Sequence, residues 1–167
     1  REQYASDLKK VLPRVPYAPD FRAFEKAGRT LAALHLDYET VEPWPVTEEA
    51  KPKGDLNDLA YYRVEKMRFA SKGGREKDRS VIVFNSRITI KGIPEQAYDY
   101  MVNGKSAIEC VMDRYEAATD KESGIKDDPN EWCRESNDPA YILNLLKRVI
   151  RVSMDTVEIV GGLPSIQ

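Results

Sequence analysis

The chain of 167 residues has the length of one domain, and its net charge at neutral pH is −2. Hydrophobic residues make up 41% and charged residues 32% of the sequence, a balance that indicates a folded globular protein and excludes wholesale disorder. No apolar run approaches the roughly 18 residues of a membrane span, so no membrane partner is expected. Two cysteines, Cys110 and Cys133, are too few for a disulfide framework and favour a cytoplasmic setting.

The first third of the chain predicts a linker, one helix and a long loop. Three prolines make residues 1–19 a linker that is extended or turn-rich after a short helix near residues 3–10. Asp20 is a suitable N-cap for a helix to about His35 that packs on a core, because apolar residues recur there every three or four positions. Residues 41–59 combine three prolines with little periodicity, which is typical of a connecting loop, and Trp44 is expected to hold this loop to the body.

Three stretches rich in β-branched and aromatic residues predict the strands of a small antiparallel sheet. The joint between the first two, SKGGREKD, contains Gly73-Gly74 and predicts a mobile hairpin loop. Asn85-Ser86 mark a second turn. The predicted strands cover residues 61–69, 80–84 and 87–90.

The last part of the chain is predicted to be mainly helical. Apolar residues cover most of its final helix, which should therefore be the most buried element of the fold. The predicted elements are a helix from Pro94 to Val102, a helix opened by a Ser106–Glu109 capping box, a polar loop over 118–137 anchored by Ile125 and Trp132, and a final helix from Asp138-Pro139 to about Val160.

The net charge conceals a strong asymmetry along the chain. Between Arg63 and Lys91 nine basic residues stand against three acidic ones, a local charge of +6, while the remaining 17 basic and 25 acidic residues sum to −8. A basic segment on an acidic body is typical of a protein that binds a polyanion. The alternative is a solvated hairpin whose lysines guard a sheet edge against aggregation.

No motif in the chain predicts catalysis, a metal site or a cofactor. His35 is the single histidine, and its place at a helix end favours a packing role over a zinc site or a catalytic triad. NGKS at 103–106 is similar to the end of a phosphate-binding loop, but Asp99 stands where that motif needs glycine. NDPAY at 137–141 differs from the N-P-P-Y motif of adenine methyltransferases by an inserted aspartate and fits a helix start better.

Double-stranded DNA is the partner that the basic β segment fits best. A two-stranded ribbon fits the major groove of B-DNA, arginine can bridge phosphates or guanine edges, and lysine supplies point charge to phosphates. The predicted contacts are Lys72, Arg75, Lys77 and Arg79, followed by Arg68, Arg87 and Lys91.

Nearly the whole chain resembles the C-terminal end of the type ISP restriction-modification enzymes. The resemblance is carried by DLKKVLPRVPYAPDFRAFEKAGRTLAALHLDYE, YYRVEKMRFA, VIVFNSRITIKGIPEQAYDYMVNGKSAIECVMDRYE and DPAYILNLLKRVIRVSMDTVEIVGGLP. Enzymes of this family carry a nuclease, an ATP-driven helicase-like translocase, a coupler, an adenine-N6 methyltransferase and a target-recognition domain on one polypeptide. The resemblance implies that this chain is a segment of such a polypeptide, the target-recognition domain. This domain would position duplex DNA for adenine-N6 methylation by the adjacent methyltransferase and for ATP-dependent cleavage by other domains. ATP, Mg²⁺ and S-adenosylmethionine are then expected in other domains and no cofactor in this one.

We therefore predict an α+β fold with a small antiparallel sheet of about three strands over residues 61–90, packed against several helices. The alternative function is an interdomain clamp that docks on the methyltransferase without touching DNA. A small independent enzyme is disfavoured because no convergent set of polar groups is evident. The single domain, 1–167, divides into a linker (1–19), a helix and long loop (20–60), the basic β segment (61–93) and a helical part (94–167).

Overall fold

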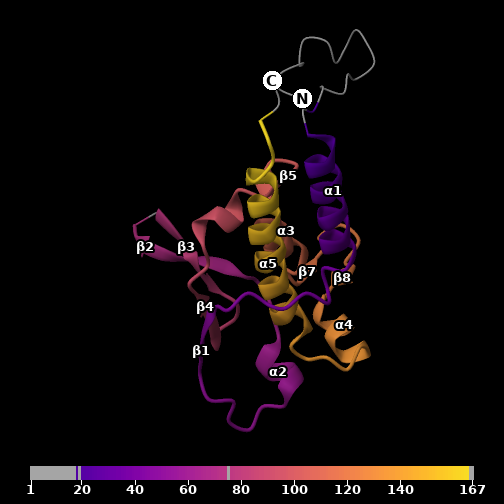
Figure 1. Ribbon diagram of the computed structural model, residues 1–167. Helices are drawn as coiled ribbons and strands as arrows, with labels where there is room; N and C mark the ends of the chain where they lie inside the picture. The colour runs from indigo at the N-terminus through magenta and orange to yellow at the C-terminus, as the bar shows by residue number, and fades with distance from the viewer. Residues whose placement is uncertain (1–17, 19, 75, 166–167) are drawn as a thin grey trace.

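A four-stranded antiparallel sheet and the long helix α5 enclose the core of the protein in the computed structural model, which describes residues 18, 20–74 and 76–165 (Figure 1). The predicted α+β fold is confirmed, whereas the linker 1–19 lies almost entirely outside the described residues. Among these residues no helix is both long and apolar enough to span a membrane. The helices are α1 (Phe21–Leu36), α2 (Asp58–Tyr62), η2 (Glu95–Tyr98, a 3-10 helix), α3 (Ala107–Arg114), α4 (Asn130–Glu135) and α5 (Tyr141–Gly161).

The main sheet has the strand order β1-β4-β3-β2, one strand more than expected. The extra strand β1 lies in the segment 41–59 that was predicted to be a loop. Its sequence, TEEA, has little β propensity, but it pairs with β4, and Glu48 and Glu49 form ion pairs with Lys147 (2.7 Å) and Lys91 (2.6 Å). Partners distant in the chain thus determine this edge strand. The strands are β1 (Thr47–Ala50), β2 (Arg68–Gly73), β3 (Glu76–Val83) and β4 (Ile88–Lys91), with short pairs β5 (Met101–Val102) with β6 (Lys105–Ser106) and β7 (Ala118–Thr119) with β8 (Lys126–Asp127).

The two faces of the sheet differ in burial. In β4, Ile88 and Ile90 are buried, whereas Thr89 and Lys91 lie on the opposite, outer face. The inner face shares one core with α3, η2 and α5, and eight residues of α5 are buried, which confirms the expectation for this helix. Because this single face is covered by helices, the outer face is left available to a partner. The largest fully buried side chains are Phe84, Ile82, Ile88, Ile90, Ile108, Ile142, Leu143, Leu146, Ile150 and Val64.

The predicted strand 61–69 is wrong over most of its length. Tyr61 and Tyr62 belong to the short helix α2, and strand pairing begins only at Arg68. Between them lies an irregular connection with a bend at Glu65, and asparagine side chains rather than a neighbouring strand bond the backbone of Arg63 and Val64. Asn130 mimics a strand partner for the fully buried Val64, accepting from its N–H (2.9 Å) and donating to its carbonyl (2.7 Å). A sequence rich in β-forming residues therefore forms an irregular connection whose buried backbone groups are bonded by side chains.

Helix α1 and the segment after it lie against α5 (Figure 1). Asp20 caps α1 as expected, yet no α1 residue is buried and Phe21 is 69% exposed, so the helix covers α5 with one half-buried stripe only. His35 ends this stripe, with Nδ1 2.7 Å from the Leu31 carbonyl, which confirms a helix-end packing role. Trp44 packs against the core cluster, which confirms that it holds its segment to the body.

The polar segments after β4 are more structured than the sequence predicts. Instead of a helix from Pro94 to Val102, the short η2 is followed by a hairpin whose turn places Asn103 (φ 51°) and Gly104 (φ 85°) in the left-handed region. NGKS is therefore a hairpin turn. The capping box of Ser106 and Glu109 is confirmed.

The predicted polar loop 118–137 contains the β7–β8 hairpin and α4. Ile125 is 68% exposed and Trp132 54% exposed, so the prediction that both anchor this loop is wrong, although the Trp132 ring lies edge-on to Tyr141. Helix α5 begins at Tyr141, later than predicted, because Asp138 caps the preceding turn instead.

Replacing Asn130 by alanine should destabilise the fold by about 3 kcal/mol, because the buried backbone N–H and carbonyl of Val64 both lose their partner. Urea unfolding followed by circular dichroism measures the loss. Gln96→Ala, a change at an exposed position of η2, is the matched control and should leave the midpoint unchanged. Equal midpoints for the two variants would show that Asn130 is dispensable.

Candidate nucleic-acid interface

The outer face of the sheet carries a row of side chains across all four strands. Arg68 lies opposite Val83, Val83 opposite Thr89, and Thr89 opposite Glu49. Cross-strand partners point to the same side of a sheet, so the small Val83 and Thr89 form a floor between two long side chains. The outer face of the sheet is thus open to solvent, with Arg68 at its β2 edge.

Strands β2 and β3 continue beyond the sheet as a two-stranded ribbon, which projects to the left in Figure 1. SKGGREKD, predicted to be a loop, is mostly paired strand, with a turn at Gly73 (φ 124°) and Gly74 (φ 60°) that needs residues free to adopt positive φ. Lys72 and Lys77 lie exposed near the tip. Arg75 is outside the described residues.

A bulge separates this ribbon from the body of the sheet. Phe69 pairs with Ile82, but Ala70 pairs with Asp78, so residues 79–81 have no partner on β2. Bulges bend a strand and increase its twist. The ribbon can therefore point away from the plane of the other strands.

Arg79, within this bulge, fastens the ribbon to the helices. The Tyr98 hydroxyl donates to the Arg79 carbonyl (2.6 Å), and the Arg79 guanidinium lies 4.1 Å from the centre of the Tyr98 ring. The guanidinium also lies 3.4 Å from a Glu109 carboxylate oxygen. A hydrogen bond from Ser106 lowers the pKa of Glu109, which stays ionised for this contact. These contacts give Arg79 a structural role.

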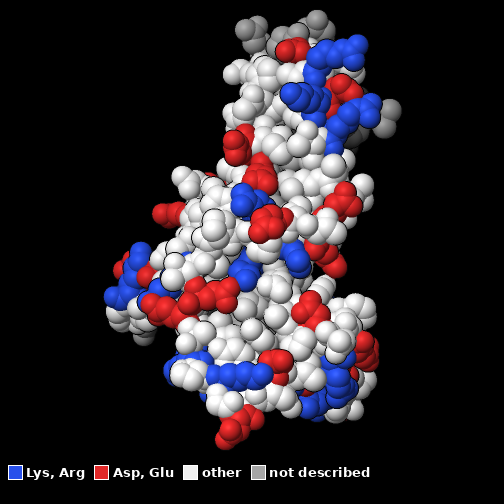
Figure 2. All heavy atoms as spheres, turned by 60° about the horizontal axis from the view of Figure 1, so that its bottom comes forward, with Lys and Arg blue, Asp and Glu red and all other residues white. Residues whose placement is uncertain are grey.

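The predicted DNA contacts do not form one stripe. Figure 2 shows Lys and Arg in separate clusters, one at the left where β2 and β3 end and others across the lower part of the view. Lys91 forms an ion pair with Glu49 on the outer face. The structure therefore brings Arg68 and Arg87 together in one cleft and places Lys72 and Lys77 on the ribbon, where the Lys77 ammonium lies 5.9 Å from the centre of the Phe69 ring. Arg79 and Lys91 are held by ion pairs within the domain.

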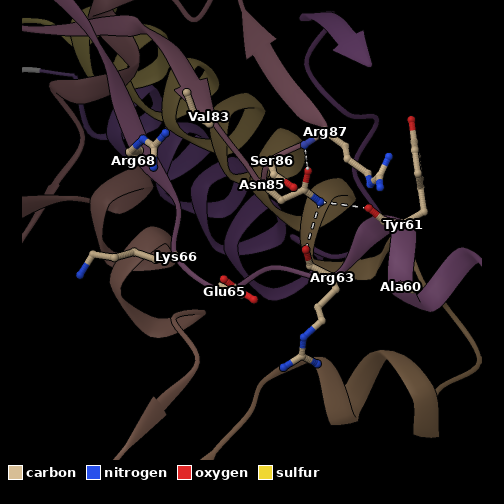
Figure 3. Close-up of a pocket in the computed structure, with 10 residues that line it drawn as sticks. All are labelled: Ala60, Tyr61, Arg63, Glu65, Lys66, Arg68, Val83, Asn85, Ser86 and Arg87. Atoms are coloured by element: carbon tan, nitrogen blue, oxygen red, sulfur yellow. Dashed lines mark hydrogen bonds between the residues drawn. The ribbon is translucent and has the colours of Figure 1, made fainter. Parts of the chain in front are cut away.

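A cleft of about 330 Å³ lies at the base of the ribbon, between the α2–β2 connection and the β3–β4 turn (Figure 3). Two of its cations are held by carboxylates outside it: Arg63 by Asp128 (2.7 Å) and Lys66 by Glu116 (2.7 Å). Within the described part of the chain, Arg68 and Arg87 form no ion pair. We call this the Arg68–Arg87 cleft; it is lined by Ala60, Tyr61, Arg63, Glu65, Lys66, Arg68, Val83, Asn85, Ser86 and Arg87.

The Asn85 side chain connects the two walls of the Arg68–Arg87 cleft. Its amide nitrogen donates to the carbonyls of Tyr61 and Arg63 (both 3.0 Å), and its oxygen accepts from the N–H groups of Arg87 and Ile88 (both 2.8 Å). All the hydrogen-bonding capacity of this amide is therefore used. The sequence predicts the turn at Asn85-Ser86, but it gives no sign of the hydrogen bonds from the Asn85 side chain to both walls.

Asp128 holds Arg63, which lines the cleft, and only 9% of the Asp128 side chain is exposed. Burial alone would raise the pKa of Asp128, but hydrogen bonds from Asn130 and Arg63 outweigh it and lower the pKa to about 2. The sequence offered no sign of this pair, because 65 residues separate its members.

The free energy of unfolding should fall by about 2 kcal/mol as the pH is lowered from about 4 to about 2. A carboxyl group whose pKa is lower in the folded state stabilises the fold above its unfolded pKa, and this contribution is lost as the folded form takes up a proton. Urea unfolding as a function of pH measures the effect. Asp128→Asn should flatten the pH dependence, whereas Asp127→Asn at the exposed neighbour should preserve it. Parallel pH profiles for the two variants would contradict the role of Asp128.

The cleft and the ribbon carry cationic side chains that can bind an anion. In residues 18, 20–74 and 76–165 there is no group of three or more His, Cys, Asp or Glu side chains that could hold a metal ion. Guanidinium and ammonium groups on a preformed surface suit phosphates and the acceptor edges of bases.

Comparisons with known proteins point to one family. A family model described as the Type ISP C-terminal specificity domain matches residues 1–145. Among solved structures, the chain is similar to a nuclease-deletion mutant of the Type ISP restriction-modification enzyme LlaGI in complex with a DNA substrate mimic, with 46% identity, a TM-score of 0.82, and coverage of 100% of this chain and 15% of that one. No curated protein gives a significant match.

Two further structures contain DNA. The ATP-dependent Type ISP restriction-modification enzyme LlaBIII bound to DNA is 43% identical, with a TM-score of 0.82 over 99% of this chain and 10% of that one. The chain of a DrdV–DNA complex is 29% identical, with a TM-score of 0.75 over 98% of this chain and 16% of that one. The present chain thus spans less than a sixth of the length of each of these proteins.

Proposed function

From the finding that this chain belongs to the Type ISP C-terminal specificity domain family, we propose that it binds duplex DNA as the target-recognition part of a longer restriction-modification enzyme. The single observation that carries the proposal is the solvent-exposed outer face of the sheet, with its projecting ribbon and with Arg68 and Arg87, which form no ion pair in the part of the chain that the structure describes. The similarity to three proteins whose structures contain DNA supports it.

The ribbon is the element that fits the major groove. A two-stranded β-ribbon matches the width of that groove, and Lys72 and Lys77 extend from the two strands near the tip. Glu76 and Asp78 lie beside them and keep the net positive charge of the tip small, so contacts there are few and local. Phosphate contacts would set the position of the domain, and base edges would supply specificity.

The rest of the longer polypeptide would perform the chemistry. An adenine methyltransferase must extrude its target base, and a domain that grips the duplex beside it holds the flanking DNA in place. We assign S-adenosylmethionine, ATP and Mg²⁺ to those other parts, and we place the enzyme with its DNA in the cytoplasm.

A docking role is the second candidate function, and exposed apolar side chains favour it. Phe21 is 69% exposed at the start of α1, and Val160 is 50% exposed near the end of α5. These helices run side by side (Figure 1). Apolar groups left at one end of a helix pair suit contact with another domain, here the adjacent methyltransferase. Docking at this end leaves the ribbon free and is compatible with DNA binding.

The test is the salt dependence of duplex binding by the 167-residue chain. Replacing Lys72 and Lys77 together by alanine should weaken binding and flatten the plot of log affinity against log salt by about 1.8, since each lost phosphate contact contributes about 0.9. Fluorescence anisotropy with a labelled duplex measures both quantities.

Arg22→Ala with Lys26→Ala is the matched control, because it removes the same charge from the exposed surface of α1. The control should bind with the wild-type slope. Indistinguishable slopes for the two double variants would remove the ribbon from the interface, and an absence of duplex binding by all three proteins would favour the docking role alone.

A further inference from the structure

We propose that the Arg68–Arg87 cleft is a cradle for the sugar–phosphate backbone of one DNA strand, beside the groove that the ribbon enters. The inference rests on the proposed function and deepens it by naming a second contact of different shape and chemistry. The ribbon is a convex element that enters a groove, whereas the cleft is a hollow that can receive a ridge.

The cleft continues along the outer face of the sheet as a groove. A second hollow of about 400 Å³ lies next to it and reaches Glu49 and Lys51 near β1. The two hollows share Arg68, Val83, Asn85, Ser86 and Arg87 as lining residues. A chain-like ligand can therefore lie across the shared floor, with one arginine at each side.

Among the described residues, the cations of the groove without an ion pair are Arg68 and Arg87 in the shared part and Lys51 beside it, while the Glu65 carboxylate also lines the cleft. Asp128 and Glu116 already neutralise Arg63 and Lys66, and in Figure 3 the side chains of these two cations point away from the centre. Arg68 and Arg87 flank Asn85 and Ser86 in the same view, without ionic partners among the described residues. Both guanidinium groups line the same groove, and each has the planar donor geometry that suits the oxygens of a phosphodiester.

The frame that holds the two arginines is rigid. Asn85 fixes the backbone N–H of Arg87 at 2.8 Å, and Lys51 donates from Nζ to the carbonyl of Ser86 (2.9 Å). Arg68 is held by its pairing with Val83. Because the backbone at both arginines is fixed before the ligand arrives, only their side chains lose conformational entropy on binding.

The position of the cleft at the ribbon base favours a backbone contact over base readout. Arg68 is the first residue of β2, and the tip of the ribbon is formed by Gly73-Gly74 at the other end of that strand. The major groove is bounded by two phosphate ridges, so an element whose tip enters the groove brings its base close to a ridge. Arginines at the base of the ribbon therefore meet phosphates before they meet base edges.

The experiment compares two double variants of the 167-residue chain. The probes are a labelled random-sequence duplex library for site selection and a single duplex for salt titration. Arg68→Ala with Arg87→Ala should weaken binding about tenfold or more and flatten the salt slope by about 1.8. Arg68→Lys with Arg87→Lys should keep the slope and the selected sequence, because lysine serves a phosphate as a point charge but cannot replace a bidentate guanine contact.

Three results would overturn the cradle. An unchanged slope in the alanine variant, with Lys72→Ala/Lys77→Ala still weakened, would exclude the cleft while leaving DNA binding intact. A changed selected sequence in the lysine variant would make the arginines base readers. No duplex binding by the wild-type chain would remove the proposed function itself.

Discussion

The candidate interface depends on the hydrogen bonds of the Asn85 side-chain amide. It binds the carbonyls of Tyr61 and Arg63 on one wall and the N–H groups of Arg87 and Ile88 on the other. Four hydrogen bonds from one half-buried side chain replace the strand pairing that the connection to β2 lacks. The position of Arg87 relative to Arg63 is thus set by a single side chain.

A similar arrangement repeats on the other side of the same segment. Asn130 bonds both backbone groups of Val64, and the Ala117 N–H donates to the Glu65 carbonyl (2.8 Å). Asp128 accepts from Asn130 and from Arg63, so the helix α4 region and the cleft share one polar network. Networks of this kind are stable when every member is satisfied, and no buried side-chain polar atom in the described residues lacks a partner.

The cations of the basic segment have different structural roles. The Arg79 guanidinium contacts the Tyr98 ring and the Glu109 carboxylate. Lys91 forms an ion pair with Glu49 on the neighbouring strand, and Arg63 forms one with Asp128. Only part of the local charge of +6 is therefore free to meet an anion. Charge counted along the sequence overstates charge available at a surface, because ion pairs with the acidic body cancel much of it.

Local signals were enough to predict the Asp20 cap, the Ser106–Glu109 capping box and the apolar periodicity of α5, and the family likeness that points to DNA is likewise present in the residues alone. Strand β1, the side-chain hydrogen bonds of Asn85 and Asn130, and the distinction between free and paired cations depend on the folded chain. Separation along the chain explains this difference. Asn85 lies 22 to 24 residues from the carbonyls it bonds, Asn130 lies 66 residues from Val64, and Arg63 lies 65 residues from Asp128. Propensity and periodicity describe near neighbours, so contacts of this range become visible only when the fold brings them together.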